Sequence, residues 1–171
     1  MKYPVAGGTY QAAAHYKVKD VLPGGALHKK LKEELDDFAA FISGMKDQQG
    51  RTVPVVFRPW HEHTGAWFWW GTASATPEEF VALWRFTVMY LRDTKGVHNL
   101  LWAYSPSRTG VSNATDYVTN RFPGFAYIDI VGLDYYTTQD TGALVALCRT
   151  IVELARQEGN VPALTEFGWI D

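Results

Sequence analysis

Hydrophobic residues return along the chain with two different periods, and segments of the two kinds alternate. Over residues 26–48 apolar positions recur every three or four residues, which predicts an amphipathic helix with one buried stripe. Two further helices are predicted, one from Pro77 to Gly96 behind a capping box at Thr76 and Glu79, and one over residues 141–158. The stripe of the first helix comprises Leu27, Leu31, Leu35, Phe38, Phe41, Ile42 and Met45.

Short apolar runs rich in β-branched and aromatic residues lie between these helices. They cover residues 53–60, 99–105, 127–136 and 161–167, and each predicts a strand. The first run (VPVVFRPW) has the profile of a strand that is buried on both faces. Residues 1–25 are rich in Gly, Ala and Tyr without a clear period, which indicates a loop.

Strands that alternate with helices predict a parallel sheet with helices packed on it. Strands recur roughly 35 to 45 residues apart, which suits the βα units of a (β/α)8 barrel, with a doubly wound open sheet as the alternative. A closed barrel needs eight strands and about 250 residues, whereas only four strands are predicted here. We therefore expect an α/β chain of one domain over residues 1–171, and favour a partial (β/α)8 TIM barrel over an open sheet in its own right.

Composition narrows the class of protein. The chain is 47% hydrophobic and 20% charged with a net charge of −2, which gives no reason to expect nucleic acid or an anionic membrane as partner. Cys148 is the only cysteine, which excludes an intrachain disulfide and a cysteine-based zinc site. No segment reaches the roughly 18 apolar residues of a membrane span, and no signal peptide is visible at the N-terminus.

Tryptophan is concentrated in one short segment. Four of the seven tryptophans, Trp60, Trp67, Trp69 and Trp70, fall close together, which suggests a flat aromatic surface that holds a ligand. Trp60 and Trp69 are favoured as core residues within that segment.

Two of the predicted strand ends carry a glutamate. Glu62 and Glu166 would meet at the carboxyl edge of the sheet, where retaining glycosidases hold a pair of carboxylates about 5 Å apart. The rival interpretation is a buried salt bridge with Arg58. A metal pair of His61 and His63 is disfavoured, because the two are only two residues apart and no HExxH motif is present.

Several motifs resemble one known family. Residues 58–71 (RPWHEHTGAWFWWG) resemble the acid/base segment of glycoside hydrolase family 26, and residues 165–169 (TEFGW) resemble its nucleophile segment. NLLWAYSPS and DIVGLDYY also fit the intervening strands of this family, and the similarity runs from about Gly24 to the end. The resemblance implies a (β/α)8 barrel of which this chain holds strands four to seven. Strands one, two, most of three, and eight would lie outside it.

The resemblance also implies roles for individual residues. Glu62 becomes the acid/base and Glu166 the nucleophile of a retaining mechanism. His61 is expected to hydrogen-bond the sugar or the nucleophile, and Tyr136, preferred to Tyr135, is expected near the nucleophile. The tryptophans expected to contact a sugar ring are Trp67 and, less directly matched, Trp70 and Trp102.

The function implied is endo-acting cleavage of β-1,4-mannosidic bonds in mannan, glucomannan or galactomannan, without a metal or other cofactor. Mixed-linkage β-glucan or β-1,3-xylan are alternative substrates in the same family, and a glycan-binding chain without activity is a further alternative. A half-barrel would leave sheet edges open, which predicts self-association or pairing with another chain. The polymeric substrates imply a secreted or periplasmic parent enzyme.

Overall fold

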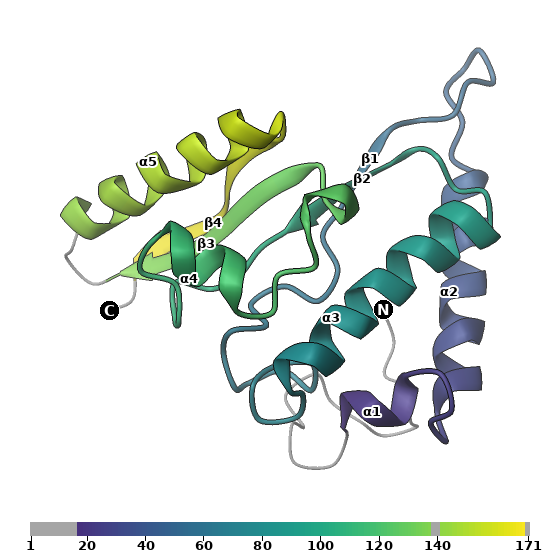
Figure 1. The fold of residues 1–171 in the computed structure, drawn as a ribbon. Coiled ribbons are helices and arrows are strands. Elements are labelled where there is room, and N and C mark those ends of the chain that lie inside the picture. The colour runs from purple at the N-terminus through teal and green to yellow at the C-terminus, as the bar shows by residue number, and fades with distance from the viewer. Residues whose placement is uncertain (1–16, 138–140, 170–171) are drawn as a thin grey trace.

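The computed structural model describes residues 17–137 and 141–169. Four parallel strands form one sheet in the order β1-β2-β3-β4 (Figure 1). With its flanking helices this sheet is a half-barrel, so the fold expected from the sequence is confirmed. The strands are β1 (Val55–Phe57), β2 (Leu100–Tyr104), β3 (Ile130–Thr137) and β4 (Val161–Trp169).

Helices connect successive strands, as a parallel sheet requires. Helix α3 starts at the N-cap Thr76, whose side chain accepts from the backbone of Glu79 while the Glu79 carboxylate accepts from the Thr76 backbone, so the predicted capping box is confirmed. Its last turn widens into the π-helical segment η1. The helical segments are α1 (Val18–Val21), α2 (His28–Ser43), α3 (Pro77–Met89), η1 (Tyr90–Thr94), α4 (Ala114–Thr119), η2 (Phe125–Tyr127) and α5 (Thr141–Glu158).

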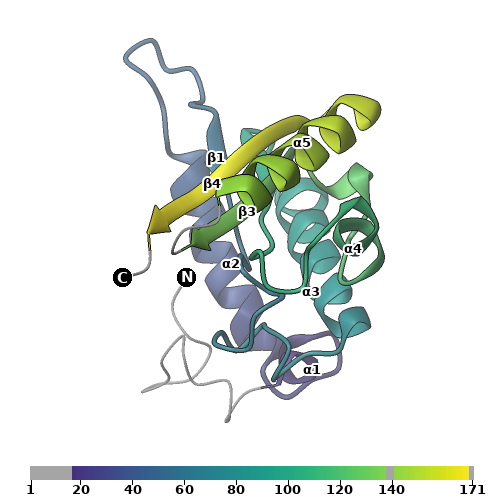
Figure 2. The ribbon, with the colours of Figure 1, turned by 90° about the vertical axis from the view of Figure 1, so that its left-hand side faces the viewer.

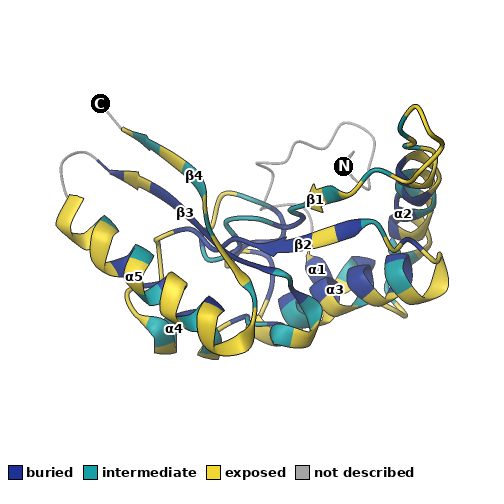
Figure 3. Ribbon diagram, turned by 90° about the horizontal axis from the view of Figure 1, so that it is seen from above, coloured by how far each residue is buried: buried dark blue, intermediate teal, exposed yellow. Residues whose placement is uncertain are grey.

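The core lies between the sheet and the helices. Figure 3 shows α3, α4 and α5 on one side of the sheet, and Figure 2 shows β3 and β4 side by side with α5 along them. Phe80, Trp84 and Tyr104 are almost fully buried there. Burial of one large apolar side chain such as Phe80 contributes about 1.5–3 kcal/mol to the free energy of unfolding. On the opposite face Val56 and Leu101 are 56% and 44% exposed. Among the residues that the structure describes, one face of the sheet is therefore uncovered.

The first strand differs from its prediction. Only Val55–Phe57 pair with β2, and the strand is not buried on both faces, because Val56 and Leu101 are register partners on the uncovered face. Pro54 has no N–H to donate, and the chain turns away from the sheet after Arg58. The predicted strand was too long because its apolar tail, including Trp60, packs in a loop.

Other boundaries shift by a few residues. Helix α2 ends at Ser43, and Phe41, expected in the buried stripe, is 66% exposed. Strand β3 begins at Ile130 because the preceding residues form the tight turn η2. The loop expected over residues 1–25 contains α1, while residues 1–16 lie outside the described part. None of the helices in the described ranges combines the length and the apolar character that a membrane span needs.

A register irregularity between Leu133 and Asp134 decides which residues of β3 and β4 face each other. Leu133 is paired with Leu164, but the next pair joins Asp134 to Glu166, so Thr165 is the extra residue on β4. Paired residues of neighbouring strands point to the same face of a sheet. The shift therefore places Asp134 and Glu166 together on the uncovered face.

Candidate active site

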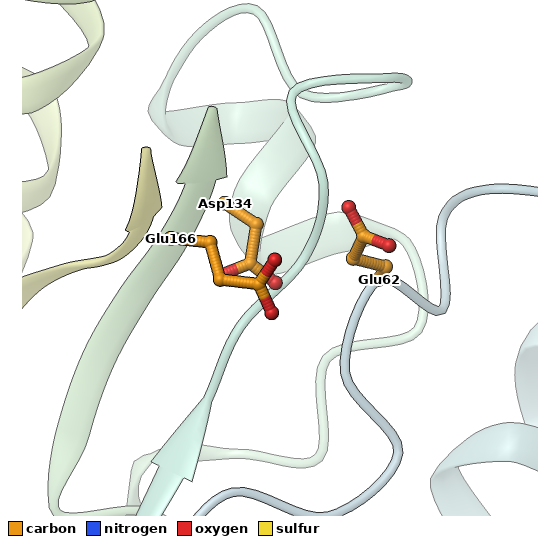
Figure 4. A group of neighbouring side chains, drawn as sticks. All are labelled: Glu62, Asp134 and Glu166. Carbon is orange, nitrogen blue, oxygen red and sulfur yellow. The ribbon is translucent and has the colours of Figure 1, made fainter. Parts of the chain in front are cut away.

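Three carboxylates converge at the carboxyl ends of the strands. Glu62 follows β1, Asp134 lies on β3 and Glu166 on β4, and one oxygen of each lies within 4.8 Å of the others. Figure 4 shows Asp134 and Glu166 next to each other and Glu62 on the loop across from them. The two glutamates singled out from the sequence are thus brought together, together with a third acid that the sequence analysis did not include.

The loop that carries Glu62 has an uncommon backbone. Trp60 and Glu62 have φ angles of 52° and 51°, in the left-handed region that costs a residue with a side chain about 1–2 kcal/mol. Two hydrogen bonds fix this conformation: the Glu62 N–H donates to the Ser105 carbonyl at 2.8 Å, and the Gly65 N–H donates to the Glu62 carbonyl at 3.0 Å. The first of these ties the loop to the end of the neighbouring strand.

The Glu62 carboxylate has one hydrogen bond from an aromatic neighbour. Trp67 Nε1 donates to Glu62 Oε2 at 2.8 Å. Burial raises the pKa of Glu62, the Trp67 hydrogen bond opposes this, and the charge of Glu166 adds to the rise. The raised pKa favours a protonated carboxyl, which suits a group that donates a proton.

Glu166 is held by donors on both of its oxygens. Arg58 Nη2 donates to Oε1, and the Tyr136 hydroxyl donates to Oε2 at 3.1 Å. Burial raises the pKa of Glu166, but Arg58 and Tyr136 outweigh it, so that the net pKa is below the ordinary value. His61 Nε2 lies 3.9 Å from Oε1, near the nucleophile candidate but beyond a hydrogen bond. Glu166 is therefore kept ionised.

Asp134 is the acid that sequence reasoning missed. It is 1% exposed and accepts from Arg58 Nη1 at 2.9 Å and from Thr165 Oγ1 at 2.7 Å. Burial raises its pKa to about 7, against the opposing effects of Thr165 and Arg58. One signal was available in the sequence: Asp134 stands two residues before Tyr136 and so shares its face of the strand.

Arg58 connects two of the three acids, Asp134 and Glu166, and is therefore part of the site. Its pairing with Glu166 is the one that the salt-bridge interpretation expected, but Glu62 takes its hydrogen bond from Trp67 instead. Among the residues that the structure describes, the three acids are the set close enough to hold a metal ion. The Arg58 guanidinium already contacts Asp134 and Glu166.

The aromatic candidates divide into surface and core. Trp67 and Tyr136 are 39% and 37% exposed beside the carboxylates. Trp70 is 9% exposed; its Nε1 donates to the His61 carbonyl at 2.7 Å, and its ring stacks on Phe68 at 4.5 Å, so it supports the loop from behind. Trp60 and Trp69 are buried, as the sequence analysis favoured.

Trp102 lies away from the carboxylates. It is 5% exposed and packs edge-to-face on Phe57 at 5.5 Å, in the layer that Phe57 shares with Phe38 of α2. Strand alternation turns the Trp102 side chain toward the helices, so the structure does not bring it to the carboxylates, and its contact with a sugar stays a prediction.

His63 also points into the core. Its ring stacks on Phe80 at 4.1 Å and tilts against Tyr104 at 4.8 Å, and burial holds its pKa well below the ordinary value. His61 and His63 are therefore turned apart, one toward Glu166 and one into the core.

The fold and sequence both have close counterparts among known proteins. A Bifidobacterium adolescentis protein named mannan endo-1,4-beta-mannosidase is 40% identical over 157 residues, which cover 87% of this chain and 16% of that protein. The catalytic domain of a Bacillus sp. JAMB-750 endo-beta-1,4-mannanase superposes with a TM-score of 0.90 at 42% identity, covering 96% of this chain and 44% of that one. A Cellulomonas fimi endo-beta-1,4-mannanase double mutant gives 0.92 at 42% identity, covering 99% and 38%.

This chain thus spans less than half the length of these relatives. The family model of glycosyl hydrolase family 26 matches residues 4–171, nearly the whole sequence. The chain belongs to glycosyl hydrolase family 26.

Proposed function

We propose that this chain carries the catalytic carboxylates of a retaining endo-β-1,4-mannanase. The observation that carries the proposal is the approach of Glu62 and Glu166 to within 4.8 Å. Retaining glycosidases hold their two carboxyl groups about 5–5.5 Å apart, whereas inverting enzymes leave about 6.5–9.5 Å for a water molecule. The names of the mannanase relatives support the substrate class.

In this mechanism the two acids have different tasks. Glu62 protonates the glycosidic oxygen as the bond to the leaving sugar breaks, and Glu166 attacks the anomeric carbon to form a glycosyl-enzyme ester. Glu62, now ionised, takes a proton from water, which attacks the same carbon and releases Glu166. The opposite pKa shifts of the two groups suit these tasks, since the acid must hold its proton while the nucleophile has lost its own.

Three neighbours would support this chemistry. Tyr136 and Arg58 orient Glu166, and the exposed indole of Trp67 offers a flat face to the apolar side of a pyranose ring. His61, 3.9 Å from Glu166, is placed to contact a hydroxyl of the bound sugar next to the attacking oxygen.

The experiment is reducing-sugar release from glucomannan, galactomannan and lichenan, with Glu166→Ala as control. Release from the mannans that the substitution abolishes is the expected result. Release from lichenan alone would retain the mechanism and replace the substrate with a mixed-linkage β-glucan. Release that survives Glu166→Ala would contradict the assignment of the nucleophile.

A chain that melts cooperatively but releases no sugar would contradict the proposed activity for this chain. Affinity electrophoresis in mannan-containing gels then tests the second candidate, glycan binding without turnover. The half-exposed Trp67 favours that candidate, since an aromatic face retains sugar affinity without any chemistry. Trp67→Ala should abolish the retardation in the gel.

A further inference from the structure

The indole of Trp67 lies directly against the backbone of Gly65. A Cβ atom placed on Gly65 would come within 2.2, 2.3 and 2.4 Å of the Cη2, Cζ3 and Cζ2 atoms of the Trp67 ring. Carbon atoms that are not bonded approach to about 3.5–4.0 Å. Any side chain at position 65 therefore excludes the present position of this ring.

Three hydrogen bonds restrain the loop at Gly65. Its N–H donates to the Glu62 carbonyl at 3.0 Å, and its carbonyl accepts from the Thr72 N–H at 2.8 Å and from the Thr72 hydroxyl at 3.1 Å. Gly65 is also not one of the residues with a positive φ angle, so alanine suits its backbone conformation. The group that must move when a side chain is added is the indole of Trp67.

The position of this ring matters because its N–H points at Glu62. With Nε1 and Glu62 Oε2 only 2.8 Å apart, a ring displaced by even an ångström no longer forms this hydrogen bond well. We propose that Gly65 is a positioning residue, whose missing side chain lets the Trp67 indole lie flat on the loop and hold the Glu62 carboxylate. The inference deepens the proposed function, since it assigns Glu62 the role given there, but its geometry stands independently of turnover.

The Trp67 side chain would then have two roles: its exposed ring would contact the sugar, and its N–H would hold the carboxylate that donates the proton. Trp67 is 39% exposed with one side of its ring on Gly65, so the part left free is the part that a sugar could reach. The hydrogen bond to the ionised carboxylate favours loss of the proton from Glu62, against burial. Removing the hydrogen bond should therefore leave Glu62 protonated to higher pH.

The test is a pH titration of the Trp67 indole N–H signal by NMR, with the signal assigned through Trp67→Phe. In the unmodified chain this signal should follow the ionisation of Glu62, and Glu62→Gln should abolish the titration. Gly65→Ala should abolish it as well. Gly44→Ala is the matched control, because a Cβ there meets its neighbours at an ordinary 3.4 Å, and it should leave the titration unchanged.

A Trp67 signal that titrates in Gly65→Ala with the original midpoint and amplitude overturns the inference, as does a signal in the unmodified chain that ignores Glu62. If Gly65→Ala alone does not fold, the thermal midpoints of Trp67→Ala and of Gly65→Ala with Trp67→Ala decide the matter. Equal thermal midpoints of these two variants would show that a side chain at position 65 is harmful only because it collides with the Trp67 ring. A double variant that also fails to fold assigns Gly65 to the backbone and overturns the proposal. None of these readouts requires sugar release, so a silent mannanase assay leaves the test intact.

Discussion

The Thr165 hydroxyl donates to Asp134 Oδ1 at 2.7 Å, which fastens the residue just before Glu166 to the neighbouring strand. The other Asp134 oxygen accepts from Arg58, which also contacts Glu166. Asp134 thus restrains Glu166 in two ways. It holds Thr165, the residue before Glu166 on β4, and it holds Arg58, the cation that pairs with Glu166.

Because Asp134 has its pKa raised to about 7 by burial, it should make stability depend on pH. The unfolded chain releases this proton near the ordinary pKa of 3.8, while the folded chain keeps it until about 7. Between these values the folded state binds more protons, so the stabilising contribution is complete below about pH 4 and is lost as the pH rises through 7. Asp134→Asn should flatten urea-unfolding free energies over this interval by up to roughly 1.4 kcal/mol per pH unit.

The quantity to compare is the difference in unfolding free energy between the unmodified chain and Asp134→Asn at each pH. The contributions of the other carboxyl groups cancel in this difference. Parallel curves between pH 4 and 7 would show that Asp134 is ionised throughout and would contradict the raised pKa.

Tyr136→Phe removes a donor to the ionised Glu166 and should raise the pKa of that carboxyl. The acid limb of the kcat/KM profile should therefore move to higher pH. A hydrogen bond to a charged group is worth about 1.5–3 kcal/mol, so kcat/KM should fall roughly ten- to a hundredfold. Tyr135→Phe is the matched control, since the Tyr135 hydroxyl is buried and accepts from Arg108 at 3.4 Å; an equal shift in both variants would count against the role of Tyr136.

Glu62→Ala should affect substrates according to their leaving groups. A general acid contributes about 10²–10⁴-fold when the leaving oxygen needs a proton, and far less when it departs as a stable anion. Hydrolysis of mannan should fall by that factor, while the first step with a dinitrophenyl β-mannobioside should be largely retained. Equal losses on both substrates, measured by stopped-flow absorbance and reducing-sugar release, would remove Glu62 from the acid role.

Thr76→Ala should lower the unfolding free energy by about 1 kcal/mol, because it removes the cap of α3. Helix α3 carries Phe80 and Trp84 into the core, so its first turn matters for the whole chain. Urea unfolding is the measurement, and Thr94→Ala, at an exposed position in η1, is the control that should have little effect. A cost no larger than that of the control would show that the capping box is not formed in solution.

Self-association remains a prediction, and β4 is the place to test it. Phe167 and Trp169 are 48% and 58% exposed on this edge strand. Multi-angle light scattering should show a mass that rises with concentration, and Trp169→Lys should reduce the rise. Gln157→Lys, on the exposed side of α5, adds the same charge elsewhere; a constant monomer mass in all three would dismiss the association.

The periodicity of hydrophobic residues predicted the helices and strands well, because burial of one face of an element makes apolar residues recur at a fixed spacing along the chain. Helix α5 matches its predicted bounds, and Glu62 and Glu166 were singled out because each comes at the end of an apolar run. Arg58 and Asp134 were not assigned to the site, since their meaning depends on a contact across three strands that no local pattern records. The side to which Trp102 points was not predicted for the same reason: helices elsewhere in the chain decide which face of β2 is covered.

The left-handed backbone at Glu62 lowers the stability of the fold, whereas the proposed chemistry requires a glutamate at this position. A φ angle of 51° suits glycine, asparagine or aspartate better than glutamate. Selection for stability alone would therefore favour another residue at this position, and the hydrogen bonds of the Glu62 N–H and carbonyl hold the glutamate in this conformation. In variants weakened elsewhere, the loop between β1 and α3 should be the first part to relax, and the proton donation proposed for Glu62 should fade before the fold is lost.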